Sequence, residues 1–224
     1  MVNFYIAATP IGNYKDITLR VCEILKSVSF IVCENESEYR RLFGYLGIDV
    51  KDFVVCSKKN EIEAIEITLR ALKSGKTGAL ISDCGTPLFE DPGFDLINSV
   101  RKSGFKITSL PGANSLVTAL SLSPFRIRDF YFAGFLPIKE EFRVKVFLEL
   151  MKRKEAVAFM ETPYRLKEVI NLLKKYLKNR KIFIPYNLTM DDETLIYGTP
   201  FEVEKIIEDK KITKGEFLII IEGI

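Results

Sequence analysis

Apolar residues in the first half of the chain fall into five short runs, and the segments between them have helical spacing. The runs cover residues 4–9, 28–34, 53–57, 77–83 and 105–110. Several are apolar at consecutive positions, which is typical of strands in a parallel sheet that helices cover on both faces. This half of the chain is therefore predicted to form an α/β domain with a mostly parallel sheet.

Two of the intervening segments carry apolar residues at the spacing of one helix face. The first stripe consists of Ile17, Val21, Ile24, Leu25 and Val28, and the second of Ile62, Ile65, Leu69 and Leu72. Asp16 directly precedes the first stripe, where a carboxylate caps free backbone N–H groups, and the glycine within 73–76 predicts the end of the second helix. Such stripes are typical of residues that pack against a core.

The second half has a different order of elements. Apolar runs predict strands at 129–136, 156–162, 181–188, 193–199 and 216–223, and helical patterns cover 114–123, 139–154, 163–177 and 201–209. Only a few polar residues separate 181–188 from 193–199, which predicts an antiparallel hairpin within a sheet of mixed direction. We therefore expect two α/β domains, 1–112 and 113–224, each with helices flanking a sheet.

Composition excludes several classes of chemistry. The chain contains no histidine, which rules out Ser-His-Asp and Cys-His triads and HExxH metal sites. The four cysteines lie far apart without a CxxC pair, so we expect reduced thiols, no metal site and a cytoplasmic protein. The net charge of +3 neither requires nor excludes a nucleic-acid partner. We see no signal-peptide pattern, and no apolar run approaches the ~20 residues of a membrane helix.

Four loops that follow predicted strands, or precede predicted helices, are rich in glycine, proline and small polar residues. Their sequences are TPIGN (9–13), SDCGTPLFEDPG (82–93), PGANS (111–115) and ETPYR (161–165). None matches GxGxxG or GxxxxGK[ST], yet ligands of α/β proteins bind at the carboxyl ends of strands. Gly85 allows close approach of the backbone to a ligand, and Asp91 with Pro92 predicts a capped helix start. The second loop has no cluster of lysines, so it suits a small ligand better than a triphosphate.

The ordered motifs ATPIGN…DITLR, SDCGTP…DPG, PGANS, ETPYR and KGEF…EG resemble the tetrapyrrole methylase family over nearly the whole chain. Within that family the chain is most similar to members that methylate the 2′-hydroxyl of a cytidine in small-subunit (16S) ribosomal RNA. The resemblance implies two α/β domains with S-adenosylmethionine bound in a cleft between them. It also implies a homodimer, with ribosomal RNA in the assembled small subunit as the partner.

Carried over motif by motif, the resemblance implies a set of cofactor-binding residues. They are Pro10, Asp83, Cys84, Gly85, Thr86, Phe89, Asn114, Ser115, Met160, Leu188 and Gly215. An RNA substrate further calls for basic residues and a stacking aromatic ring near the site. The candidates are Arg20, Arg40, Arg41, Tyr164, Arg165 and the basic run 174–181.

Methyl transfer from a sulfonium is an in-line displacement that depends largely on positioning, which suits a chain without histidine. A ribose hydroxyl nevertheless needs a group that accepts its proton. The carboxylates expected near the site are Glu34, Asp83 and Glu161, and we select Glu34 and Glu161 as candidate catalytic residues. Each of the three could equally be a helix cap or an ion-pair partner.

The chain departs from the family at positions expected to face the methyl acceptor. Asn35, Glu36 and Ser37 stand where Asp, Thr and Arg are usual. Tyr164 replaces a histidine, and residues 186–190 replace an Arg-Glu-Leu-Thr-Lys sequence. Two alternatives therefore stay open: a methyltransferase whose acceptor is a tetrapyrrole or another small molecule, and a homologue that binds S-adenosylmethionine or RNA without catalysis.

Overall fold

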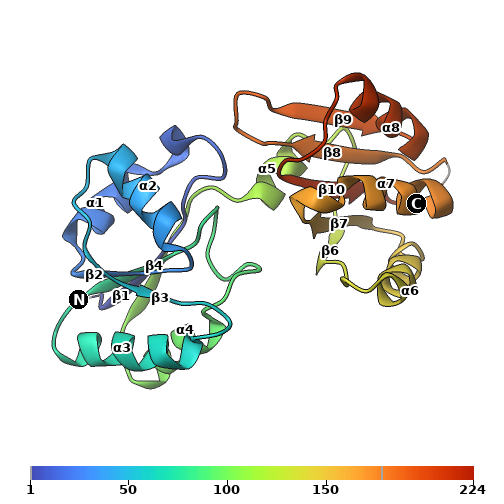
Figure 1. Cartoon of the computed structure of the whole chain (residues 1–224). Helices are drawn as coiled ribbons and strands as arrows, with labels where there is room; N and C mark the ends of the chain where they lie inside the picture. Colours follow the sequence, from blue (N-terminus) through green and yellow to red (C-terminus); the bar gives the residue numbers. More distant parts are fainter. Residues whose placement is uncertain (1, 178) are drawn as a thin grey trace. The chain divides into compact units, whose positions relative to one another are not determined.

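The computed structural model describes residues 2–177 and 179–224 and divides the chain into two compact units (Figure 1). The N-terminal unit ends at Asn114 and the C-terminal unit begins at Ser115. Within the described residues, no helix has the length and apolar character needed to span a membrane.

The N-terminal unit is built on a five-stranded sheet in the order β3-β2-β4-β1-β5. Its strands are β1 (Phe4–Ala7), β2 (Phe30–Cys33), β3 (Asp52–Val55), β4 (Gly78–Ile81) and β5 (Ile107–Leu110). Each pair of neighbouring strands is parallel. The predicted parallel sheet is therefore confirmed, and all of its carboxyl-terminal strand ends lie at one edge.

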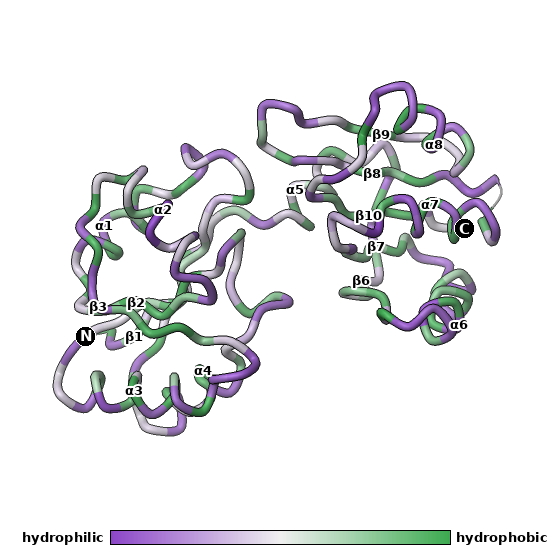
Figure 2. The backbone as a smooth tube through the Cα atoms, in the orientation of Figure 1, coloured by the Kyte–Doolittle hydropathy of each residue, from purple (hydrophilic) through white to green (hydrophobic). Residues whose placement is uncertain are grey.

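Helices cover both faces of this sheet, which explains why its strands are apolar at consecutive positions. They are α1 (Leu19–Ser27), α2 (Glu36–Leu46), α3 (Glu61–Lys73) and α4 (Phe94–Lys102). Helices α1 and α2 pack on one face, where Val21 and Tyr39 join a buried cluster with Ile31. Helices α3 and α4 pack on the other face, where Leu72 and Leu96 join a second cluster (Figure 1). Hydrophobic and hydrophilic residues alternate along α3, as its position between core and solvent requires (Figure 2).

Several local details of the N-terminal unit differ from the sequence predictions. Asp16 does not cap α1, because it lies in a short 3₁₀ helix (Tyr14–Asp16), and the Thr18 side chain accepts the capping hydrogen bond from the Val21 N–H instead. Ile62 lies 78% exposed, because the buried face of α3 is centred on Ala64, Thr68 and Leu72. Helix α2 was not predicted from the sequence.

The predicted cap at Asp91 is also wrong. Helix α4 begins only at Phe94, after Gly93, which makes no side-chain capping bond. The carboxylate of Glu61, at the start of α3, accepts hydrogen bonds from the N–H groups of Asp95 and Leu96 at 3.1 and 3.3 Å. The free amides of one helix are therefore satisfied by the neighbouring helix, not by a residue that precedes them in the chain.

The C-terminal unit contains a second five-stranded sheet in the order β6-β7-β10-β8-β9. Its strands are β6 (Phe130–Phe135), β7 (Ala156–Glu161), β8 (Ile182–Tyr186), β9 (Thr194–Gly198) and β10 (Phe217–Ile221). Strands β6 and β7 are parallel and the remaining pairs are antiparallel, so the predicted mixed sheet and the β8–β9 hairpin are confirmed.

The helices of this unit are α5 (Ser115–Ser121), α6 (Glu140–Leu150), α7 (Leu166–Leu177) and α8 (Pro200–Asp209), with a 3₁₀ turn at Pro163–Arg165. Phe147 of α6, Leu173 of α7 and Val203 of α8 are fully buried and share one cluster with Phe159 and Ile219 of the sheet. These three helices therefore pack against the sheet face that carries the odd-numbered residues of β7 and β10.

Candidate active site

The N-terminal sheet has a topological switch point between β1 and β4. These strands are neighbours, but the chain leaves β1 through α1 toward β2 and leaves β4 through α4 toward β5. Helices α1 and α4 pack on opposite faces of the sheet, so the two connections run in opposite directions over opposite faces. The crevice outside the carboxyl ends of such strands is where open α/β sheets bind ligands. The loops at this point include 9–13 and 82–93, two of those singled out from the sequence.

Hydrogen bonds join the loops after β1 and β4. The backbone N–H of Thr9 donates to the Gly85 carbonyl at 2.8 Å, and the buried Thr9 hydroxyl donates to the Ser82 carbonyl at 3.1 Å. The Ser82 hydroxyl donates to the Gly85 carbonyl at 2.9 Å. Thr86 links this pair to the loop after β5, since its hydroxyl donates to the Ala113 carbonyl at 3.0 Å. The roles of Thr9 and Ser82 were not predicted from the sequence.

Close packing around two glycines holds these loops together. Gly85 has a φ of +84°, and a Cβ there would lie 3.2 Å from Cγ2 of Ile11. A Cβ on Gly112 would lie 2.9 Å from the Cβ of Ala8. Only glycine therefore fits where the three loops meet. Among the predicted cofactor residues of these loops, Pro10 is buried, whereas Cys84 and Phe89 are exposed.

Carboxylates give this edge of the sheet a negative character. Asp83 has an exposed surface, yet partial desolvation together with the charges of Glu34 and Glu38 raises its pKa to about 6. Burial, followed by the charges of Glu34, Asp83 and Glu90, raises the pKa of Asp91 to about 6 as well. The loops 8–13, 82–93 and 111–115 contain no lysine or arginine. The edge therefore favours a cationic ligand over a polyphosphate.

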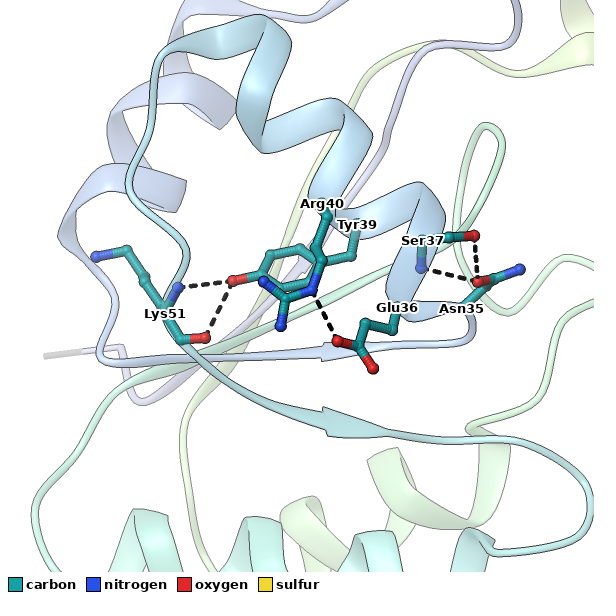
Figure 3. A network of polar contacts seen from close by, with 6 residues as sticks. All are labelled: Asn35, Glu36, Ser37, Tyr39, Arg40 and Lys51. Carbon is teal, nitrogen blue, oxygen red and sulfur yellow. Dashed lines mark hydrogen bonds and ion pairs between the residues drawn. The ribbon is translucent and has the colours of Figure 1, made fainter.

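Asn35, Glu36 and Ser37, three of the residues expected to depart from the family sequence, lie at the N-terminus of α2 (Figure 3). The side-chain oxygen of Asn35 accepts hydrogen bonds from the N–H and the hydroxyl of Ser37 at 2.9 and 2.8 Å, which is an N-cap. Arg40 pairs with Glu36 at 2.7 Å in the next turn (Figure 3). The Tyr39 hydroxyl, on the buried side of α2, bonds to the backbone of Lys51 (Figure 3). These residues are thus well accommodated locally.

Strand directions bring the predicted residues of the C-terminal unit to one sheet edge. Strands β7 and β8 are both antiparallel to β10, so both end where β10 begins. Phe217, the first residue of β10, pairs with Glu161 on one side and with Tyr186 on the other. Met160, Leu188 and Gly215, which are 27 or more positions apart in the sequence, therefore belong to the same edge.

A hydrogen-bonded turn surrounds Gly215. The Tyr186 hydroxyl donates to the Lys214 carbonyl at 2.6 Å, and its ring lies where a Cβ on Gly215 would be, at 2.4 Å or less. Asn187, with a φ of +47°, accepts a hydrogen bond from the Glu216 N–H through its side chain and donates its own N–H to the Glu216 carbonyl, both at 2.8 Å. The segment before β10 is thereby tied to the end of β8.

Glu161 and Arg165, two further candidates, form a buried ion pair at 3.1 Å. The Glu161 side chain has no exposed surface, and its Oε1 also accepts a hydrogen bond from the Thr162 N–H at 2.9 Å. Burial raises the pKa of Glu161, while the Thr162 amide and Arg165 act in the opposite direction. Arg143 of α6 lies beside this pair and forms an ion pair with Glu168 at 3.2 Å. This geometry favours a structural role for Glu161 and Arg165.

The other candidates for RNA contact differ in how available their charges are. Arg20, Arg40 and Arg41 are exposed, although Arg40 and Arg41 each pair with a glutamate of α2. Tyr164 is 76% exposed. Within the basic run 174–181, Lys174 pairs with Glu204, and Lys178 lies outside the described residues.

The comparisons with known proteins agree with this architecture. A family model described as tetrapyrrole (corrin/porphyrin) methylases matches residues 3–204. The chain belongs to this family, and it is an S-adenosylmethionine-dependent methyltransferase.

Curated relatives named ribosomal RNA small subunit methyltransferase I match nearly the whole chain. The protein of Borrelia garinii is 36% identical over 218 residues, covering 97% of this chain and 97% of the relative. The Vibrio cholerae protein is 36% identical, over 98% of this chain and 76% of the relative. The Bacillus subtilis protein is 35% identical, over 98% of this chain and 74% of the relative.

Solved structures confirm the fold. A cobalt precorrin-4 methyltransferase superimposes with a TM-score of 0.72 over 98% of this chain and 94% of its own, at 15% identity. The uroporphyrin III C-methyltransferase of Thermus thermophilus superimposes with a TM-score of 0.66 over 99% of this chain and 97% of its own, at 14% identity. At such low identity these likenesses concern architecture alone.

Proposed function

We propose that the protein transfers a methyl group from S-adenosylmethionine to the 2′-hydroxyl of a cytidine in small-subunit (16S) ribosomal RNA. The observation that carries the proposal is the match, at 35–36% identity over nearly the whole chain, to relatives named for methylation of small-subunit ribosomal RNA. The cytoplasm, where ribosomal subunits assemble, is the corresponding location.

The edge of the N-terminal sheet suits the positive charge of S-adenosylmethionine. The cofactor carries a positive sulfonium, and the nearby carboxylates Asp83, Asp91 and Glu34 supply negative charge. Gly85 and Gly112 let the three loops pack closely at their junction, because a Cβ at either position would meet Ile11 or Ala8. Backbone amides and carbonyls at this junction suit the polar groups of an adenosyl and an amino-acid moiety.

The residues proposed to hold the cofactor are those that the family motifs imply. They are Pro10, Asp83, Cys84, Gly85, Thr86, Phe89, Asn114, Ser115, Met160, Leu188 and Gly215. The cofactor supplies a methyl group that its positive sulfur already activates toward a nucleophile. The chain's own contribution is to orient the acceptor oxygen in line with that methyl group and to exclude water.

Proton acceptance from the ribose hydroxyl is assigned to the pair of Glu34 and Asp83. Glu34 directly follows β2 and is partly exposed, and its charge is one cause of the raised pKa of Asp83. A carboxylate with a pKa of about 6 is a stronger base than an ordinary aspartate and is still ionised at neutral pH. Glu161 lacks exposed surface and is engaged by Arg165, so it is the poorer candidate.

A homodimer is proposed as the functional assembly. Strand β6 is an edge strand of its sheet, and it exposes Phe130 and Phe135, while α6 exposes Phe142 and Val146. A second copy of the chain would cover such apolar side chains. Light scattering at micromolar concentration tests this point, and a monomeric mass would contradict it.

Methyl transfer is tested by incubating the purified protein with radiolabelled S-adenosylmethionine and small ribosomal subunits that lack this modification. Naked 16S RNA and a porphyrinogen are the parallel acceptors. Label on the RNA of the subunit supports the proposal, whereas label on the porphyrinogen favours a tetrapyrrole acceptor. Cofactor binding by calorimetry without transfer to any acceptor would favour a non-catalytic homologue.

A further inference from the structure

The 3₁₀ turn of the C-terminal unit presents an aromatic ring and a lysine side by side at the sheet edge described above. Tyr164 is 76% exposed, and the ammonium group of Lys214 lies 4.5 Å from the centroid of its ring. Lys214 is itself exposed, and it belongs to the segment KKITK (210–214) between α8 and β10. The two residues are 50 positions apart in the sequence, so the fold brings them together.

The backbone beneath this pair is held firmly, although the side chains face solvent. Arg165, next to Tyr164, is anchored by its buried ion pair with Glu161. The carbonyl of Lys214 accepts the 2.6 Å hydrogen bond from the Tyr186 hydroxyl. A rigid backbone that carries exposed side chains is the arrangement expected of a preorganised binding surface.

Lys214 and Arg165, the arginine next to Tyr164, differ in how much of their positive charge a ligand can reach. The Arg165 side chain is only 14% exposed and pairs with Glu161, so little of its charge is available to a ligand. The Lys214 ammonium is exposed and lies against a neutral ring, and a charged neighbour is the Glu216 carboxylate, whose pKa it lowers against the larger, opposite effect of burial. A phosphate contact near the ETPYR loop is therefore better made by Lys214 than by Arg165.

We infer that Tyr164 and Lys214 form a contact site for single-stranded RNA, in which a base stacks on the Tyr164 ring and the neighbouring phosphate contacts Lys214. The inference rests on the proposed function, because it assigns part of the acceptor site of that reaction. Stacking on an aromatic ring combined with a basic side chain is how proteins bind unpaired nucleotides. Met160 and Gly215, proposed cofactor residues, lie within four positions of Tyr164 and Lys214 respectively.

The test measures binding of the full-length protein to unmodified small ribosomal subunits over a series of KCl concentrations. Lys214→Met should reduce the salt dependence of log K by about one unit, as expected for one lost phosphate contact. Tyr164→Ala should weaken binding about ten-fold with little change in that slope, because a stacked base is lost. Tyr164→Phe should bind as the wild type does, since the ring stacks and the hydroxyl does not.

Lys205→Met is the matched control, because Lys205 is an exposed lysine of α8 in the same unit. If it lowers the slope as much as Lys214→Met does, the effect is a general one of net charge and the inference is overturned. Unchanged subunit binding by Tyr164→Ala also overturns the inference. So does a loss of S-adenosylmethionine affinity, measured by calorimetry, in Tyr164→Ala or Lys214→Met. If these variants behave as wild type while the wild type methylates subunits, only this inference fails. If the wild type transfers no methyl group to subunits, the proposed function fails with it.

Discussion

Replacing Gly215 with alanine should destabilise the C-terminal unit. The added Cβ would lie 2.3–2.4 Å from the hydroxyl and two ring carbons of Tyr186, far inside van der Waals contact. Tyr186 is 6% exposed, so its ring has little room to move without breaking the hydrogen bond to the Lys214 carbonyl. Overpacking costs about 1–3 kcal/mol and the lost hydrogen bond about 1 kcal/mol, which gives an expected loss of about 2–4 kcal/mol.

Urea unfolding followed by far-UV circular dichroism measures this loss, and hydrogen exchange of β8 and β10 peptides localises it. Gly44→Ala is the matched control, because a Cβ there meets nothing within 4 Å inside α2, and it should stabilise the protein by up to about 1 kcal/mol. In a Tyr186→Leu background the effect of Gly215→Ala should shrink by at least half. A Gly215→Ala protein as stable as wild type, or one equally destabilised in both backgrounds, would refute the steric explanation.

Three further substitutions test the charges described above. Asp83→Asn should make the protein more stable at pH 8 but not at pH 4. The pKa of Asp83 is raised to about 6 in the folded state, so its ionisation opposes folding as the pH rises through 4–6. Unfolding midpoints of variant and wild type that differ equally at both pH values would contradict this. Glu61→Ala should lower the free energy of unfolding by about 1 kcal/mol, because the first amides of α4 lose their acceptor, and Glu61→Gln should lower it less. Unfolding in urea measures both losses, and an unchanged stability of Glu61→Ala would contradict the prediction. Glu161→Ala should cost up to about 3 kcal/mol, because buried Arg165 loses its closer carboxylate partner and keeps only Glu168 at 3.9 Å. Glu161→Gln should keep most of the methyl-transfer rate. Abolished transfer by a folded Glu161→Gln protein would restore Glu161 as the base.

The order of strands and helices could be predicted from the sequence because buried strands and amphipathic helices leave strong periodic patterns. Each strand among the described residues was predicted at the position where the structure has it, with ends that differ by at most two residues. Helix ends were less predictable, because side chains compete for them. Thr18 caps α1 where Asp16 was predicted, since Asp16 is already part of a 3₁₀ turn. The α4 amides bond to Glu61, which is 33 positions before Phe94 in the sequence.

The candidate site divides in a similar way. The loops after β1 and β4, which contain glycine, proline and small polar residues, could be recognised from local sequence, and the strand order places them at one switch point. Glu161 and Arg165 are only four positions apart, but the burial of their ion pair could not be predicted, because it depends on how the end of β7 and the 3₁₀ turn pack within the unit. The same holds for Tyr186, whose ring is the reason that position 215 requires glycine.

The chemical identity of the methylated nucleoside tests the central claim most directly. Subunit RNA labelled by the protein from S-adenosylmethionine would be digested to nucleosides and separated by liquid chromatography with mass spectrometry. We predict that the label appears as 2′-O-methylcytidine from a single position, and that Glu34→Gln and Asp83→Asn lower its yield by at least ten-fold. Label on a base, on another nucleoside, or on no RNA at all would contradict the account.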